Sequence, residues 1–107
     1  EKYRNAPFRA TLIVALVSTK KDHPKVPEME QIISTGTAGQ NIMLALSALG
    51  YGAIWRTGSF AFNNKISEKF GLNENQTIIG YIYIGTPMGK KKSLPEMNTN
   101  DYISIWD

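Results

Sequence analysis

One apolar segment, residues 11–18, most constrains how this chain can fold. Its sequence, Thr-Leu-Ile-Val-Ala-Leu-Val-Ser, is apolar at nearly every position and rich in β-branched residues. A strand with one solvated face would alternate apolar and polar residues, so this run indicates a strand that is covered on both faces. We therefore expect it to lie in the middle of a sheet that is packed by helices.

A long helix is predicted over residues 28–49, because Pro27 can occupy its first turn and Gly50 supplies a stop. From Ile42 onward this helix is apolar on almost every side. Its second half must therefore be deeply buried, or covered by another subunit.

Two glycines of the predicted helix, Gly36 and Gly39, belong to its apolar stripe. Glycine weakens a helix but lets a neighbouring backbone approach closely. Both tight packing inside the core and a helix at a dimer interface are consistent with this pattern.

The remaining sequence predicts a strand over residues 53–57, a short helix capped by Asn63 or Asn64, and a last strand over residues 77–84. The alternation of strands and helices favours a three-layer α/β arrangement with right-handed crossovers. Residues 85–107 break all periodicity and are predicted to form an extended tail. The apolar residues near the end of this tail indicate a docking segment or an edge strand.

Composition limits the class of protein. The chain has 107 residues, 42% of them hydrophobic, with a net charge of +3, no cysteine and one histidine. It is thus predicted to be one folded domain without disulfides, a metal centre or a cysteine nucleophile. No apolar run reaches the roughly 18 residues of a membrane span, and no export signal opens the chain, so we expect a cytoplasmic protein with no membrane partner. The lysine groups lack interleaved aromatic residues, so nucleic acid is not expected as a partner either.

The segment Trp55-Arg56-Thr57-Gly58 is the strongest candidate for a binding site. An indole, a guanidinium and a hydroxyl at the end of a strand could line a pocket for a planar, anionic ligand. A core tryptophan beside a surface arginine is an equally good interpretation. Nucleotide-binding glycine motifs, a hydrolase elbow and a pair of acid–base carboxylates are all absent from the sequence. Any catalytic chemistry would then belong to a bound cofactor, and no catalytic side chain is predicted.

A set of sequence stretches occurs in one order along essentially the whole chain. They are residues 5–10 (Asn-Ala-Pro-Phe-Arg-Ala), the hydrophobic strand, residues 25–28 (Lys-Val-Pro-Glu) with Glu30 and Gln31, residues 48–58 (Ala-Leu-Gly-Tyr-Gly-Ala-Ile-Trp-Arg-Thr-Gly) and residues 79–87 (Ile-Gly-Tyr-Ile-Tyr-Ile-Gly-Thr-Pro). Together they resemble the FMN-dependent nitroreductase family.

The resemblance implies an α+β, three-layer α/β/α nitroreductase-like fold. This chain would form its C-terminal portion, with about three strands, two helices and an extended C-terminal arm. The resemblance also implies a homodimer with FMN bound at the subunit interface. Such proteins oxidise NADH or NADPH through FMN and pass the electrons, in a ping-pong cycle, to small nitroaromatic or quinone-like acceptors.

Site residues follow from the same resemblance. Trp55, Arg56 and Thr57 fall on the segment that contacts FMN, where the backbone faces the flavin. The segment assigned to the nicotinamide nucleotide comprises Ala45, Leu46, Ser47, Ala48, Leu49 and Gly50.

The resemblance also implies that residues 1–107 are the C-terminal part of one domain whose N-terminal half is absent from this chain. We expect a complementary segment in another chain, a cleaved protein or a remodelled fragment, and the 107 residues alone are expected to be inactive. The alternative function is a non-catalytic flavin- or nucleotide-binding or assembly module derived from the same fold.

Overall fold

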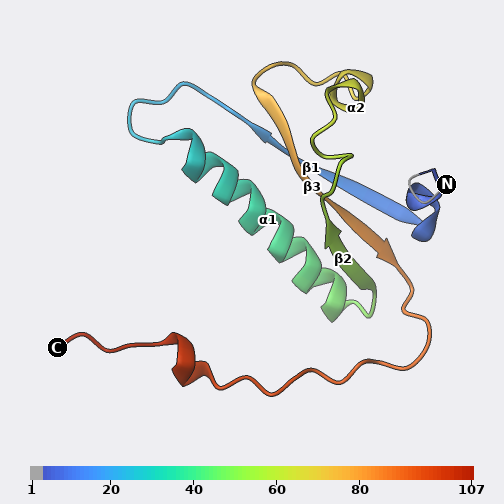
Figure 1. Ribbon diagram of the computed structural model, residues 1–107, viewed down its shortest axis with the longest axis vertical. Coiled ribbons are helices and arrows are strands. Elements are labelled where there is room, and N and C mark those ends of the chain that lie inside the picture. Colours follow the sequence, from blue (N-terminus) through green and yellow to red (C-terminus); the bar gives the residue numbers. More distant parts are fainter. Residues whose placement is uncertain (1–3) are drawn as a thin grey trace.

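The computed structural model describes residues 4–107 and shows one three-stranded sheet with a long helix on one face (Figure 1). The elements in chain order are the 3-10 helix η1 (Ala6–Arg9), β1 (Leu12–Thr19), α1 (Glu28–Ala48), β2 (Gly52–Arg56), α2 (Asn64–Lys69), β3 (Gln76–Gly85) and the 3-10 helix η2 (Thr99–Tyr102). The predicted helices and strands are therefore confirmed within one or two residues at each boundary. Gly50 lies two residues after the end of α1 and has φ +84°, a conformation that glycine adopts without strain.

Strand β3 lies between β1 and β2 and is antiparallel to both. The prediction that residues 11–18 form the middle strand is therefore wrong, because β1 lies at an edge of the described sheet. The apolar pattern of β1 has a different cause. Both of its faces contact apolar clusters, since Leu16 packs on the side of α1 while Val17 packs on the opposite side.

The connections between strands also differ from the predicted crossovers. β2 and β3 are antiparallel neighbours, so the α2 connection that joins them is not a crossover between parallel strands. β1 and β2 run in the same direction, but β3 lies between them. Chain order alone could not show this, because it does not specify which strands pair.

Two apolar clusters occupy the two faces of the sheet. On the α1 side, the fully buried Ile82 packs with Leu16 and Ile84, and Met43 and Leu46 of the helix lie against them. The cluster on the other face contains Ala61, Ile78 and Tyr81, with Phe60, Ile66 and Leu72 from the α2 region. The three-layer arrangement is thus present, although the α2 layer consists of a six-residue helix and its flanking loops.

Much of the predicted apolar surface stays exposed within this chain. In the second half of α1, the side chain of Leu44 is 58% exposed, so deep burial by this chain itself is excluded. On the other face of the sheet, an apolar hollow of about 380 Å³ remains open. It is lined by Pro7, Ile13, Ala15, Phe60, Ile66, Phe70, Tyr81 and Tyr83.

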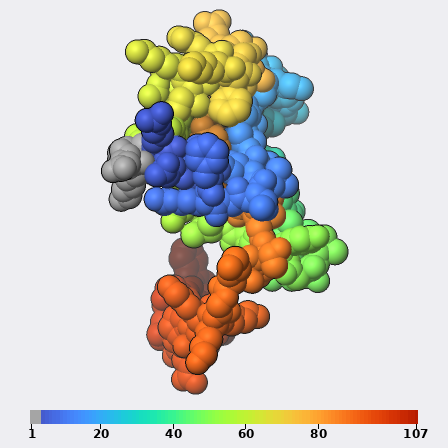
Figure 2. Space-filling view, turned by 90° about the vertical axis from the view of Figure 1, so that its right-hand side faces the viewer, coloured from blue at the N-terminus to red at the C-terminus, as the bar shows by residue number. Residues whose placement is uncertain are grey.

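The chain after Pro87 runs away from the sheet as an extended tail, which Figure 2 shows projecting below the rest of the molecule. Within residues 4–107 the tail forms no strand of the sheet, so the prediction of an edge strand is wrong for this chain by itself. Trp106 near its end is 92% exposed. The docking-segment interpretation stays a prediction.

Candidate functional site

The end of β2 places the predicted flavin-contacting residues on different faces of the sheet. Trp55 points toward α1, where it packs against the Leu16, Ile82 and Ile84 cluster. A Cβ added at Gly39 of the helix would lie 2.5 Å from the indole Cζ3 atom. The close approach of α1 to the sheet therefore depends on glycine at this position. The half-buried Trp55 packs against the core and Arg56 is exposed, which agrees with the interpretation of a core tryptophan beside a surface arginine. The binding-pocket interpretation stays a prediction.

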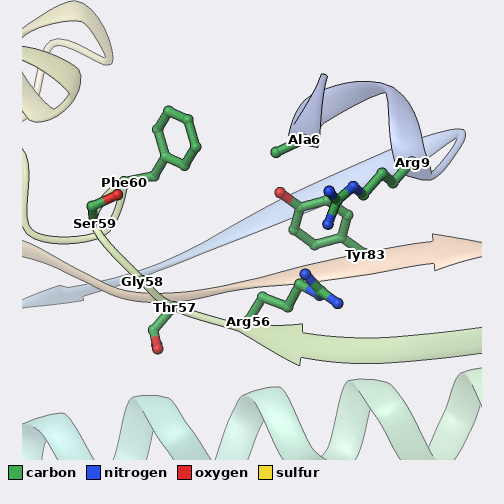
Figure 3. Close-up of a pocket in the computed structure, with 8 residues that line it drawn as sticks. All are labelled: Ala6, Arg9, Arg56, Thr57, Gly58, Ser59, Phe60 and Tyr83. Carbon is green, nitrogen blue, oxygen red and sulfur yellow. The ribbon is translucent and has the colours of Figure 1, made fainter. Parts of the chain in front are cut away.

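Arg56 lies on the opposite face and lines a hollow of about 250 Å³ (Figure 3). The hollow is lined by Ala6, Arg9, Arg56, Thr57, Gly58, Ser59, Phe60 and Tyr83. In Figure 3, the side chains of Arg9, Arg56 and Tyr83 gather at one end, and Ser59 and Phe60 lie at the other. Three separate elements build this hollow, namely η1, β3 and the chain that leaves β2.

A second hollow of about 340 Å³ adjoins the same side chains, because Arg9, Arg56 and Tyr83 line it as well. Its other walls come from the start of β2 and from the chain that leaves β3. The two arginines and Tyr83 thus stand between two depressions of the surface. We call these three residues the Arg9–Arg56–Tyr83 cluster.

Two guanidinium groups make this cluster cationic, with no ion pair to either of them in the part of the chain that the structure describes. The guanidinium carbon of Arg56 lies 6.0 Å from the centre of the Tyr83 ring, at the limit of a cation–π contact. Neither Arg9 nor Arg56 forms an ion pair with a carboxylate within residues 4–107, where the ion pair found joins Lys20 to Glu28. The guanidinium groups are therefore available to an anion.

The loop after Arg56 offers backbone and hydroxyl groups to the hollow. Gly58 has φ +74° and open space where a Cβ would stand. Within the described part of the chain, the N–H groups of Gly58 and Ser59 donate to no acceptor. The Gly58 carbonyl accepts from the N–H of Ala61, and the Tyr81 hydroxyl donates to the Phe60 carbonyl at 3.3 Å, so the loop is anchored to the sheet. Burial raises the pKa of Tyr81, which keeps this hydroxyl protonated.

The predicted nicotinamide segment, residues 45–50, lies at the C-terminal end of α1 and away from this loop. Leu46 packs into the core cluster. Ser47 and Gly50 line a different hollow of about 330 Å³, together with Pro87 and Lys91. Ala45, Ala48 and Leu49 are exposed and line neither this hollow nor that of Figure 3. The structure of this chain therefore does not bring the two predicted segments into one pocket.

Neither a metal site nor a membrane span is found in the part of the chain that the structure describes. No group of three His, Asp or Glu side chains there is arranged to hold a metal ion. Among the same residues, no helix has both the length and the apolar character needed to cross a membrane.

Comparison with known proteins identifies the family. Residues 1–86, well over half of the chain, match the Nitroreductase family. The chain belongs to the nitroreductase family.

Relatives of this nitroreductase-family chain are longer than the chain itself. The "Putative NAD(P)H nitroreductase YdjA" of Escherichia coli strain K12 is 42% identical over 90 residues, which are 84% of this chain and 49% of that protein. The "Putative NAD(P)H nitroreductase" of Haemophilus influenzae is 31% identical over 107 residues, covering 96% of this chain and 57% of its own length. The chain thus spans about half the length of the relatives that it matches.

Solved structures agree on the fold. A nitroreductase family protein from Clostridium difficile superposes with a TM-score of 0.73 at 21% identity, over 91% of this chain and 60% of that one. A nitroreductase-like protein from Bacillus cereus gives a TM-score of 0.71 at 20% identity, over 87% of this chain and 49% of that one. The predicted α+β nitroreductase-like fold is therefore confirmed.

Sequence reasoning about this nitroreductase-family chain missed two members of the cluster. Arg9 belongs to the stretch that carries the family resemblance, and Tyr83 belongs to a predicted strand, but neither was assigned a role. The alternation of β3 side chains could have placed Tyr83 on the face opposite the one that Ile82 and Ile84 occupy. No local signal could have shown that η1 brings Arg9 to the end of β2.

Proposed function

We propose that this chain supplies part of the FMN site of an NAD(P)H-dependent oxidoreductase of the nitroreductase type. The observation that carries the proposal is the loop after β2, where N–H groups without an acceptor in residues 4–107 and a guanidinium without an ion pair there line one hollow. Membership of the nitroreductase family and the names of the relatives, which mention NAD(P)H, support the same function.

The residues present suit a flavin mononucleotide. Its isoalloxazine ring is flat and carries hydrogen-bond acceptors, and its phosphate is an anion. Within the described residues, the N–H groups of Gly58 and Ser59 have no acceptor, and the absence of a side chain at Gly58 allows close approach of a ring. Arg56 supplies positive charge at the same hollow. These groups are a part of a flavin site, because the hollow of about 250 Å³ is open and smaller than a whole cofactor pocket.

The roles of the predicted contacts differ in this proposal. Trp55 would act by fixing the strand end against α1, so that the backbone of residues 55–57 is held rigidly for the flavin. Arg56 would stabilise negative charge on the bound group, and Thr57 offers a hydroxyl to the hollow. When bound, FMN would supply the chemistry by taking electrons from NADH or NADPH and giving them to a nitroaromatic or quinone-like acceptor.

The assignment of residues 45–50 to the nicotinamide nucleotide has weaker support. Ser47 is the one polar side chain of the segment, and Lys91 is the charged neighbour in the hollow beside it. We propose that this segment contacts the nicotinamide nucleotide, because Ser47 and Gly50 line a surface depression.

A complete site would need further protein. We propose that the open apolar hollow under Phe60 and Tyr81 and the exposed side of α1 are covered by the N-terminal half of the fold and by a second copy in a homodimer. The apolar side chains of the tail, which project into solvent here, would then pack on the partner.

The test is flavin retention by an arginine variant. The protein is incubated with FMN, freed of unbound flavin and measured by visible absorption. We expect Arg56→Ala to weaken FMN binding by about tenfold, which corresponds to the loss of one charged hydrogen bond. Lys25→Ala, which removes an exposed loop charge that lines none of the hollows described, should retain FMN like the unsubstituted protein.

Equal FMN retention in both variants would contradict the role of Arg56. A flavin-loaded protein that oxidises neither NADH nor NADPH would instead favour the alternative function, a non-catalytic flavin-binding or assembly module.

A further inference from the structure

The side chain of Arg56, the last residue of β2, takes its direction from the neighbouring strand β3. In the pairing of the two strands, Arg56 lies opposite Tyr81, but its guanidinium lies over the ring of Tyr83, two residues further along β3. Diagonal neighbours of this kind are roughly 7–8 Å apart across a sheet, which a long side chain spans. The Arg56 side chain therefore leans back along β2 rather than out into solvent.

The Tyr83 ring is a firmly mounted support for that side chain. Tyr83 belongs to the central strand, where it pairs with Ile13 of β1 on one side and with Ile54 of β2 on the other. Its side chain is half-buried and lines both hollows that Arg56 lines, as well as the apolar hollow on the same face. A ring on a strand that is paired along both edges has little freedom to move with the arginine.

The contact with the ring leaves the charge of Arg56 intact. The guanidinium carbon lies 6.0 Å from the ring centre, within reach of the negative face of the aromatic system. Arg56 forms no ion pair within residues 4–107. A carboxylate would hold the guanidinium by its N–H donors and so compete with an anionic ligand, whereas a ring under the group leaves those donors free.

Arg9 makes such a support necessary. It lines the same two hollows as Arg56, and in the view of Figure 3 the Tyr83 ring is seen between the two guanidinium groups. Two like charges on neighbouring elements repel each other. The attraction of Arg56 to the ring opposes this repulsion and keeps the guanidinium beside the hollow.

We propose that Tyr83 is a positioning residue, whose ring rather than its hydroxyl holds the Arg56 guanidinium at the hollow after β2. The consequence for the cofactor rests on the proposed function. A side chain that is already held in place loses less conformational entropy when an anion binds to it. Tyr83 thus strengthens flavin binding through Arg56.

The contact itself is tested by NMR, without flavin. In the isotope-labelled protein, the ring current of Tyr83 should displace the signal of the Arg56 Nε–H group. We expect Tyr83→Phe, which keeps a ring, to retain this displacement and Tyr83→Leu to lose it. The matched control is Phe8→Leu, which removes a ring of η1 that is 84% exposed and lines none of the hollows described, and it should leave the Arg56 signal unchanged.

The effect on the cofactor is tested by FMN titration of the same variants, followed by flavin fluorescence. Tyr83→Leu should weaken FMN binding by about two- to fivefold, the size of an exposed cation–π contact. Tyr83→Phe and Phe8→Leu should stay within about twofold of the unsubstituted protein, because the ring under Arg56 is kept.

A double variant separates positioning from a general structural role. If Tyr83 acts through Arg56, Tyr83→Leu combined with Arg56→Ala should bind FMN like Arg56→Ala alone, which is about tenfold weaker than the unsubstituted protein. Two independent effects would instead multiply to about twenty- to fiftyfold. If circular dichroism shows that Tyr83→Leu does not fold, a nuclear Overhauser contact between the Arg56 side chain and the Tyr83 ring of the unsubstituted protein decides the test, and its absence would overturn the proposal.

Several other results would overturn the proposal. They are an Arg56 signal that is the same in all variants, equal loss of FMN affinity in Tyr83→Phe and Tyr83→Leu, and multiplying effects in the double variant. Equal FMN affinity of Tyr83→Leu and the unsubstituted protein would overturn this inference and leave the proposed function standing. A protein that binds no FMN but shows a displaced Arg56 signal that depends on the Tyr83 ring would contradict the proposed function and support the inference.

Discussion

At the residue scale, the packing of α1 on the sheet depends on the absence of two side chains. The Trp55 indole occupies space that a Cβ at Gly39 of the helix or at Gly80 of β3 would enter. Leu16 closes the same gap, since its Cδ1 would lie 2.6 Å from a Cβ at Gly39. Gly36, one turn earlier in α1, has nothing within 4 Å of that position. The two helical glycines thus have different roles, and the core-packing interpretation holds for Gly39.

Gly39→Ala should lower the free energy of unfolding by about 1–3 kcal/mol, because the new methyl group overpacks the contact with Trp55 and Leu16. Urea denaturation followed by circular dichroism measures the change.

The matched control is Gly36→Ala. Alanine has the higher helix propensity and meets no neighbour there, so this change should raise the free energy of unfolding by roughly 0.5–1 kcal/mol. If Gly39→Ala is as stable as Gly36→Ala, the close approach of α1 to Trp55 does not exist in solution.

At the element scale, α2 is the weakest part of the second layer. It has six residues, and isolated helices of this length are not stable in water. Its start is fixed by the Asn63 side chain, which accepts a hydrogen bond from the Lys65 N–H at 3.0 Å. Of the two predicted caps, the structure therefore selects Asn63. Ile66 then joins the Ala61, Ile78 and Tyr81 cluster, so the cap also supports the core on that face.

Asn63→Ala should destabilise the protein by about 1 kcal/mol through loss of this cap. Asn64→Ala, at the first helical position, removes no capping bond and should change stability by less than about 0.5 kcal/mol. Amide hydrogen exchange in α2, read for both variants, measures the difference. Equal exchange in the two variants would contradict the capping role of Asn63.

At the scale of the whole molecule, the chain is more expanded than a compact domain. Its radius of gyration is 17.2 Å, whereas a compact domain of about 100 residues has a radius near 13 Å. The tail accounts for much of the difference, because it extends from the sheet without packing on it (Figure 1). Its exposed Ile105 and Trp106 are a contiguous apolar group. Exposed apolar groups of this kind favour contact with another surface.

Removal of residues 88–107 should therefore abolish self-association. We expect the 107-residue chain to sediment as a dimer in analytical ultracentrifugation and the truncated chain to sediment as a monomer, because the truncation removes the exposed apolar side chains that would contact the proposed partner.

A variant with Lys90, Lys91 and Lys92 replaced by Gln keeps the apolar residues of the tail and should remain dimeric. Dimerisation of the truncated chain, or a monomeric complete chain, would exclude the tail as an association segment.

The local elements could be predicted from the sequence because their causes are local. The apolar run of β1, the glycine after α1 and the asparagine before α2 each act within a few residues of their own position. The predicted site residues stay a prediction, although Arg56 and Thr57 at the end of β2 do line a hollow. The sequence could not show that residues 45–50 lie at a different hollow from Arg56, because their place relative to β2 depends on how α1 packs on the sheet.

The sequence by itself determined the secondary structure, the apolar character of both sheet faces and, through its motifs, the nitroreductase family. Only the tertiary structure decided that β3 is the central strand, that Trp55 belongs to the core, and that Arg9 joins Arg56 beside Tyr83. The reason is physical: helix ends and apolar periodicity depend on neighbours along the chain, whereas strand pairing and side-chain clusters depend on contacts between residues far apart in sequence.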